Sequence, residues 1–135
     1  MHPISILLCE VYEELYKRGE VAFPLYDAQI DGIDSIVKTI NAGYFGVERF
    51  PRSSLKAAAY FCHLINGHKL VDGNKRLAVL WLQTYCDISG LEISMKEGVT
   101  LDALAVAVEE RHKIDSELIH LVELVLFYKL LSSNA

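Results

Sequence analysis

The nine residues from His68 to Arg76 combine a base, a carboxylate, a glycine turn and two cations. They directly precede a strongly apolar run, which predicts a helix that begins at this point. Lys75 and Arg76 would lie in the first turn of that helix, where a cation opposes the helix dipole at a cost of roughly 0.3–1 kcal/mol. A phosphate chain bound between the backbone N–H groups and these two side chains would explain the arrangement.

Phosphoryl or nucleotidyl transfer requires positioning, charge neutralisation and a base near the attacking hydroxyl, and the motif offers a candidate for each. Histidine side chains titrate near neutral pH, so His68 is the candidate catalytic base. Asp72 is a hard oxygen ligand of the kind that holds Mg²⁺ together with phosphate oxygens. The candidate nucleotide- and phosphate-binding residues are Gly73, Asn74, Lys75 and Arg76.

Each of these residues also has an ordinary structural interpretation. Asp72 could cap the helix, Asp72-Gly73 could form a simple turn, and Lys75 and Arg76 could be a solvated pair. Their coincidence at the start of one apolar helix favours the functional interpretation. Other nucleotide-binding and hydrolase motifs are absent from the sequence, which has no G-x-x-x-x-G-K-[ST], G-x-G-x-x-G, G-x-S-x-G or H-E-x-x-H.

The composition is that of a soluble globular protein, with 52% hydrophobic and 23% charged residues. A length of 135 residues predicts a single domain over residues 1–135. The net charge of −5 argues against direct nucleic-acid binding, which needs a basic face. No run approaches the ~20 apolar residues that span a membrane, and Cys9, Cys62 and Cys86 are too scattered for a disulfide or zinc framework. A cytoplasmic location is therefore expected.

Apolar residues at helical spacing predict an all-α fold. The expected helices cover about 4–17, 34–40, 53–66, 77–90, 100–108 and 115–126, with a turn at 31–32, an irregular segment at 44–51 and a short strand at 91–93. The helix after the motif is apolar on nearly every side, which predicts that it is buried at the centre of the fold.

From His68 to Arg76 the sequence resembles the signature of the Fic/Doc family, and specifically of its death-on-curing (Doc) branch, H-x-F-x-[D/E/N]-[A/G]-N-K-R. The matching positions are His68, Asp72, Gly73, Asn74, Lys75 and Arg76. Typical Fic sequences have a glycine where this chain has Lys75 and a second arginine where it has Val79, and both differences favour Doc. Leu70 replaces the usual phenylalanine and can still anchor the loop in the core.

The resemblance implies a Fic/Doc-like helical domain and a role as the toxin of a bacterial or phage toxin–antitoxin pair. It implies a kinase that uses ATP and Mg²⁺ to phosphorylate a Ser or Thr hydroxyl of a translation factor, elongation factor Tu, and so blocks translation. His68 would then be the base, Asp72 the Mg²⁺ ligand, and the residues from Gly73 to Arg76 the phosphate-binding turn. The implied partners are a cognate antitoxin and the elongation factor.

Two alternatives stay open beside this interpretation. A Fic-like enzyme would use the same residues to transfer AMP to a protein hydroxyl, with the nucleotide in the opposite orientation, although Lys75 argues against it. A non-catalytic member of the family would act through protein binding alone, although the intact His68 and Asp72 argue against it.

Overall fold

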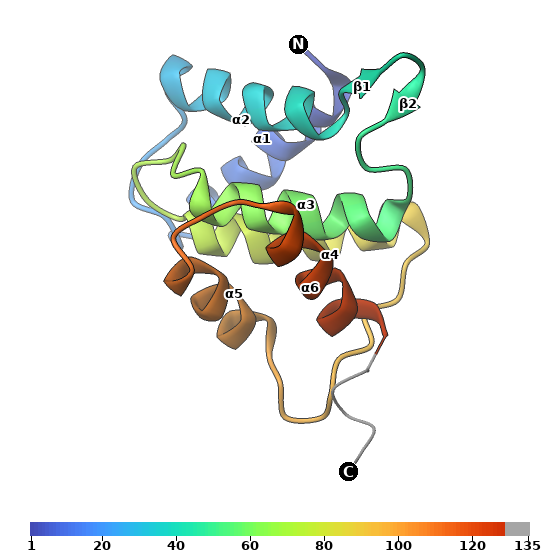
Figure 1. Cartoon of the computed structure of the whole chain (residues 1–135). Coiled ribbons are helices and arrows are strands. Elements are labelled where there is room, and N and C mark those ends of the chain that lie inside the picture. Colours follow the sequence, from blue (N-terminus) through green and yellow to red (C-terminus); the bar gives the residue numbers. More distant parts are fainter. Residues whose placement is uncertain (129–135) are drawn as a thin grey trace.

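Helices make up almost all of the regular structure in residues 1–128, the part of the chain that this computed structural model describes (Figure 1). The six helices of this part are α1 (Pro3–Lys17), α2 (Asp27–Ile40), α3 (Ser53–Asn66), α4 (Asn74–Ser89), α5 (Leu101–Glu110) and α6 (Ser116–Phe127). The strands β1 (Gly43–Tyr44) and β2 (Val47–Glu48) pair as an antiparallel hairpin. The predicted all-α fold is confirmed, while residues 129–135 of the expected domain lie outside the described part.

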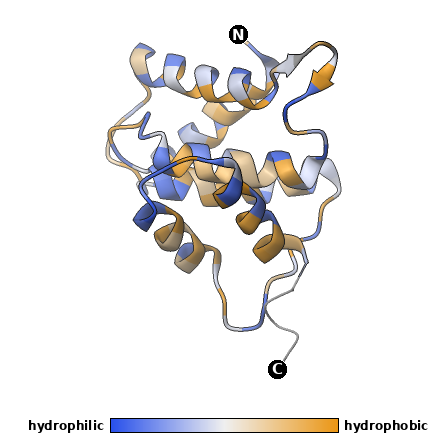
Figure 2. Cartoon of the chain, in the orientation of Figure 1, coloured by the Kyte–Doolittle hydropathy of each residue, from blue (hydrophilic) through white to orange (hydrophobic). Residues whose placement is uncertain are grey.

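The helices form three layers (Figure 1). α1 and α2 lie on one side of a middle layer formed by α3 and α4, and α5 and α6 lie on the other side. Hydrophobic residues run through the two middle helices, whereas many of the connecting segments are hydrophilic (Figure 2). None of the helices in residues 1–128 combines the length and the hydropathy that crossing a membrane requires.

The central helix is α3, not the helix after the motif as the sequence suggested. α3 contacts α2, α4, α5 and α6, and nine of its residues are buried. Its three consecutive alanines, residues 57–59, are all fully buried and let neighbouring helices approach closely from several directions. α4 instead buries one face, around Trp81, while Gln83 and Asp87 give it an exposed polar side. These polar residues interrupt the apolar run, so α4 lies beside the centre of the fold.

Two of the correctly predicted helix starts have a side-chain cap. The Thr100 hydroxyl accepts the Ala103 N–H at 3.1 Å at the start of α5, and an Asp115 carboxylate oxygen accepts the Leu118 N–H at 2.8 Å at the start of α6. The helices were expected to begin at about residues 100 and 115, so these two predicted starts are confirmed.

Three local predictions were wrong. The expected turn at 31–32 lies inside α2, the segment expected to be irregular contains the hairpin, and residues 91–93 form no strand. A glycine suits position 32 because the motif loop packs closely there: a Cβ at this position would lie 2.8 Å from the Cβ of Lys69 in that loop. The glycine that suggested a turn therefore makes room for the motif loop.

Candidate active site

The motif loop, residues 67–73, joins the end of α3 to the start of α4 and decides where the motif side chains lie. His68 and Gly73 both have positive φ, 49° and 86°, which turns the chain sharply within the loop. The Asn74 side chain clamps Leu70: its Oδ1 accepts the Leu70 N–H and its Nδ2 donates to the Leu70 carbonyl, both at 3.2 Å. Leu70 is 7% exposed and anchors the loop in the core, as predicted.

Asp72 lies against the segment that joins α1 to α2. Its Oδ2 accepts the Ala22 N–H at 3.2 Å, and the residue is exposed. The buried Tyr12 of α1 lies close by, and its hydroxyl donates to the Phe23 carbonyl at 2.7 Å. Burial, and then the negative charge of Asp72, raise the pKa of Tyr12. Tyr12 therefore stays neutral and acts as a structural support for this side of the loop.

A metal ion at this site would have Asp72 as its protein ligand. Within residues 1–128 there is no group of three or more His, Cys, Asp or Glu side chains that could hold a metal ion by themselves. Mg²⁺ usually binds through one or two carboxylates and completes its shell with phosphate oxygens and waters. The single exposed carboxylate of Asp72 fits this manner of binding.

The amino end of α4 lacks the kind of side-chain cap that begins α5 and α6. Gly73 is its N-cap residue, and no side chain caps the helix. The N–H groups of the first helical turn have no partner within the helix, and such groups attract phosphates. Gly73 is required here because its φ is left-handed and because a Cβ at this position would overlap Cγ1 of the buried Val21.

Lys75 lies on the side of α4 that faces α5. Its ammonium contacts both carboxylate oxygens of Glu109, at 3.0 and 2.9 Å. The hydrogen bond from Lys75 is the main cause of a lowered pKa of Glu109, and the charges of His68 and His112 add to the effect. His68 is therefore close enough for its charge to act on the Glu109 carboxylate.

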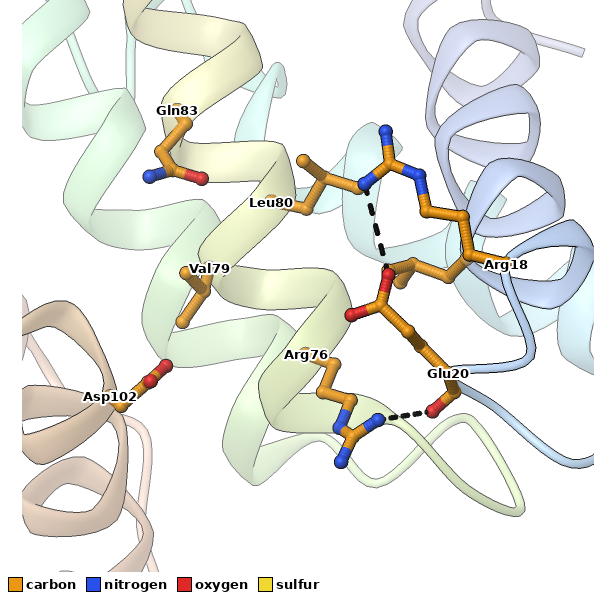
Figure 3. Close-up of a pocket in the computed structure, with 8 residues that line it drawn as sticks. Arg18, Glu20, Arg76, Val79, Leu80, Gln83 and Asp102 are labelled. Carbon is orange, nitrogen blue, oxygen red and sulfur yellow. Dashed lines mark hydrogen bonds and ion pairs between the residues drawn. The ribbon is translucent and has the colours of Figure 1, made fainter.

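Arg76 turns the other way, toward the segment after α1. Its Nη1 donates to the Glu20 carbonyl at 2.6 Å (Figure 3). The Arg76 side chain lines a cavity of about 390 Å³, whose other charged lining residues are Arg18, Glu20 and Asp102. Figure 3 shows Asp102 on α5 across this cavity from Arg18 and Glu20.

The structure therefore brings some of the predicted site residues together and separates others. Lys75 pairs with Glu109, on whose pKa the charge of His68 also acts, whereas Arg76 lies on another side of α4. Successive residues of an α-helix point about 100° apart, so the side chains of Lys75 and Arg76 leave the helix in different directions. The expected convergence of both cations on one pocket is not seen in this structure.

Two residues outside the motif, neither of them predicted from the sequence, hold its surroundings in place. Asn66 donates through Nδ2 to the carbonyls of Val108 and Lys113, at 2.9 and 2.8 Å, and so ties the end of α3 to α5 and to the segment that follows it. Glu109 pairs with Lys75. The sequence around each residue does not indicate these contacts. Asn66 before a glycine is typical of a helix end, and the acidic pair Glu109-Glu110 is typical of a solvent-exposed helix face.

Comparison with known proteins identifies a family. The Fic/DOC family model matches residues 5–86, which include most of α1, all of α2 and α3, the motif loop and most of α4. A protein of Mycolicibacterium smegmatis named Toxin Doc is 34% identical over 84 residues, which are 61% of this chain and 65% of that protein. The similarity thus spans just under two thirds of the relative. No solved structure matches the chain.

Proposed function

The chain belongs to the Fic/DOC family, and on this premise we propose that it is a Doc-like kinase that transfers the γ-phosphate of ATP to a Ser or Thr hydroxyl of another protein. The observation that carries the proposal is the uncapped amino end of α4, with Lys75 in its first turn and His68 and Asp72 in the loop directly before it. An anion site, a base and a metal-binding carboxylate are the parts that phosphoryl transfer needs.

Two groups of the chain would bind the phosphates. The N–H groups at the start of α4 and the Lys75 ammonium would hold phosphate oxygens, and Gly73 allows the backbone to approach them closely. Asn74 contributes by holding the loop in shape through Leu70. Arg76 would reach the nucleotide only after its guanidinium leaves the Glu20 carbonyl.

Two further residues would carry the chemistry. His68 is exposed in the loop, where it would take the proton from the attacking hydroxyl. Asp72 keeps one carboxylate oxygen beyond the one that accepts the Ala22 N–H, and this oxygen would bind Mg²⁺. The metal, when bound, would neutralise charge on the phosphates.

Transfer of label from ATP tests the reaction directly. The protein is incubated with bacterial lysate, Mg²⁺ and ATP labelled at either the γ- or the α-phosphate. Transfer of the γ-label supports the kinase. Transfer of the α-label instead would replace the proposal with AMP transfer, and labelling of neither kind in an active lysate would leave a protein-binding role.

The biological role that we propose rests on the relative named Toxin Doc. The chain would act as the toxin of a toxin–antitoxin pair, with a translation factor, elongation factor Tu, as its substrate and a cognate antitoxin as its inhibitor. Induced production of the protein alone would then arrest bacterial growth and label that factor. Growth that continues at full rate with active protein present would contradict this role.

A further inference from the structure

Lys75 is the side chain proposed to bind phosphate, yet in this structure a carboxylate already neutralises its charge. Glu109, in the last turn of α5, contacts the Lys75 ammonium with both of its oxygens, at 3.0 and 2.9 Å. The two side chains are 41% and 37% exposed. Ion pairs with this much solvent contact are weak, so the pair holds Lys75 without locking it in place.

The charges of motif residues also act on the Glu109 carboxylate. The Lys75 hydrogen bond, and then the charges of His68 and His112, lower the pKa of Glu109, so its carboxylate is ionised at neutral pH. A phosphate chain that approaches Lys75 would therefore meet a negative charge already bound to the same ammonium. The two anions would repel each other at contact distance.

We propose that Glu109 occupies the anion-binding position of Lys75 and that an incoming polyphosphate has to displace it. The inference rests on the proposed function, in which Lys75 contacts a phosphate. The few N–H donors of a lysine ammonium are shared among its partners. Glu109 already accepts from the Lys75 ammonium through both carboxylate oxygens, which leaves less for a phosphate. Glu109 thereby sets the affinity of the site for its polyphosphate ligand, although it lies outside the motif and touches no reacting atom.

The substitution Glu109→Gln tests this inference because it removes the charge and keeps the size of the side chain. We expect the variant to bind inorganic tripolyphosphate about threefold to tenfold more tightly than the wild type, as fits the loss of one exposed ion pair and its repulsion. Glu109→Lys should give a larger gain, since it adds a second cation at the same place.

Isothermal titration of the whole protein with tripolyphosphate, without divalent cations, measures this affinity. The matched control is Glu110→Gln, which makes the same change of charge at the neighbouring exposed position and should bind like the wild type. Lys75→Met and the double variant Lys75→Met/Glu109→Gln complete a cycle. Circular dichroism spectra confirm that every variant is folded.

A gain in Glu109→Gln that disappears in the Lys75→Met background supports the inference. Unchanged or weaker binding by Glu109→Gln overturns it, because Glu109 would then only hold Lys75 in place or take no part. A gain that persists without Lys75 overturns it as well. If the wild type transfers γ-phosphate while Glu109→Gln binds no better, the inference fails and the proposed function stands; if no variant binds tripolyphosphate and no label is transferred, both fail.

Discussion

His68 and Gly73 show how the backbone at single positions shapes the candidate site. Both residues have left-handed φ values, and this conformation is costly for most L-residues and free for glycine. Gly73 adopts the left-handed conformation without strain because it has no Cβ, whereas His68 has one. A side chain kept at a strained position is consistent with a functional role for the imidazole.

Removal of the His68 imidazole should abolish activity while the fold is kept. His68→Asn is the sharper variant, because asparagine tolerates the φ of 49° and carries no base. We expect His68→Asn and His68→Ala each to lower transfer of the γ-label by at least about 100-fold, the usual contribution of a general base. Thermal unfolding followed by circular dichroism should show a wild-type midpoint for His68→Asn. Full activity in either variant would remove His68 from the mechanism.

Gly73→Ala should destabilise the protein by about 2–4 kcal/mol, the sum of a left-handed backbone penalty and of overlap with a packed neighbour. The overlap is with Cγ1 of Val21, which is 4% exposed and has little space to move. Gly19→Ala is the matched control, since Gly19 has a similar φ of 74° and no atom within 4 Å of the added Cβ. Urea unfolding measures both; equal losses would show that the contact with Val21 costs nothing.

The motif residues could be found from the sequence, and their orientations could not. His68, Asp72 and the turn that follows are recognisable because unusual residue types are adjacent in the chain. The hydrogen-bond partners of Lys75 and Arg76 are Glu109 and the Glu20 carbonyl, which lie 34 and 56 residues away in the sequence. Such distant partners leave no mark on the local pattern, so the predicted shared pocket could not be checked without the structure.

At the scale of elements, a buried carboxylate fixes α6 against the start of α3. Glu123 of α6 is 2% exposed, and it accepts hydrogen bonds from Arg52 Nε and Nη2, both at 2.7 Å, and from the Ser54 hydroxyl at 2.6 Å. The hydrogen bond from Arg52 is the main cause of a lowered pKa of Glu123. The pair stabilises the orientation of the helix that carries Asn66 and the motif loop at its other end.

Loss of either partner of this pair should be costly. Glu123→Ala and Arg52→Ala are each expected to lower the free energy of unfolding by about 2–4 kcal/mol, at or below the usual range for a buried pair because Arg52 is half exposed. The double variant should lose about 1–3 kcal/mol less than the sum of the two. Chemical denaturation of the four proteins measures the coupling, and strictly additive losses would show that the pair contributes nothing to stability.

Helix prediction succeeded where the signal was local and failed where packing decided. Thr100 and Asp115 indicate the starts of α5 and α6 because a helix cap is a contact between residues three apart in the sequence. The space that Gly32 leaves for the motif loop and the central place of α3 depend instead on which elements pack against each other. In the sequence alone, neither Gly32 nor the alanine run of α3 indicates such packing. Their role is to leave space for a neighbouring element, and that element is distant in the chain.

At the scale of the whole molecule, burial of one titratable side chain couples the fold to pH. His63 lies on the central helix α3, and its Nε2 is buried without a hydrogen-bond partner in the described part of the chain. Burial, and then the positive charge of Arg49, lower the pKa of His63 from 6.5 to about 4. The folded protein therefore binds this proton less readily than the unfolded chain does.

The sign of the effect follows from this difference. Between pH 6.5 and 4 the unfolded chain takes up the His63 proton and the folded protein does not, so stability falls as the pH is lowered through this range. With 1.36 kcal/mol per pKa unit, the loss from pH 7 to 4.5 should be about 2 kcal/mol. The lowered pKa values of Asp34, about 2, and of Glu123 act in the same direction but at more acid pH, below the ordinary values of 3.8 and 4.5.

His63→Gln should therefore make stability nearly independent of pH between 7 and about 5, the window that His63 controls and that the carboxylates do not reach. Unfolding by urea at several pH values measures the free energy for the variant and the wild type. His68→Asn is the histidine control, since it removes an exposed imidazole and should keep the wild-type slope. A His63→Gln variant that still loses about 2 kcal/mol over this range would mean that another group carries the dependence.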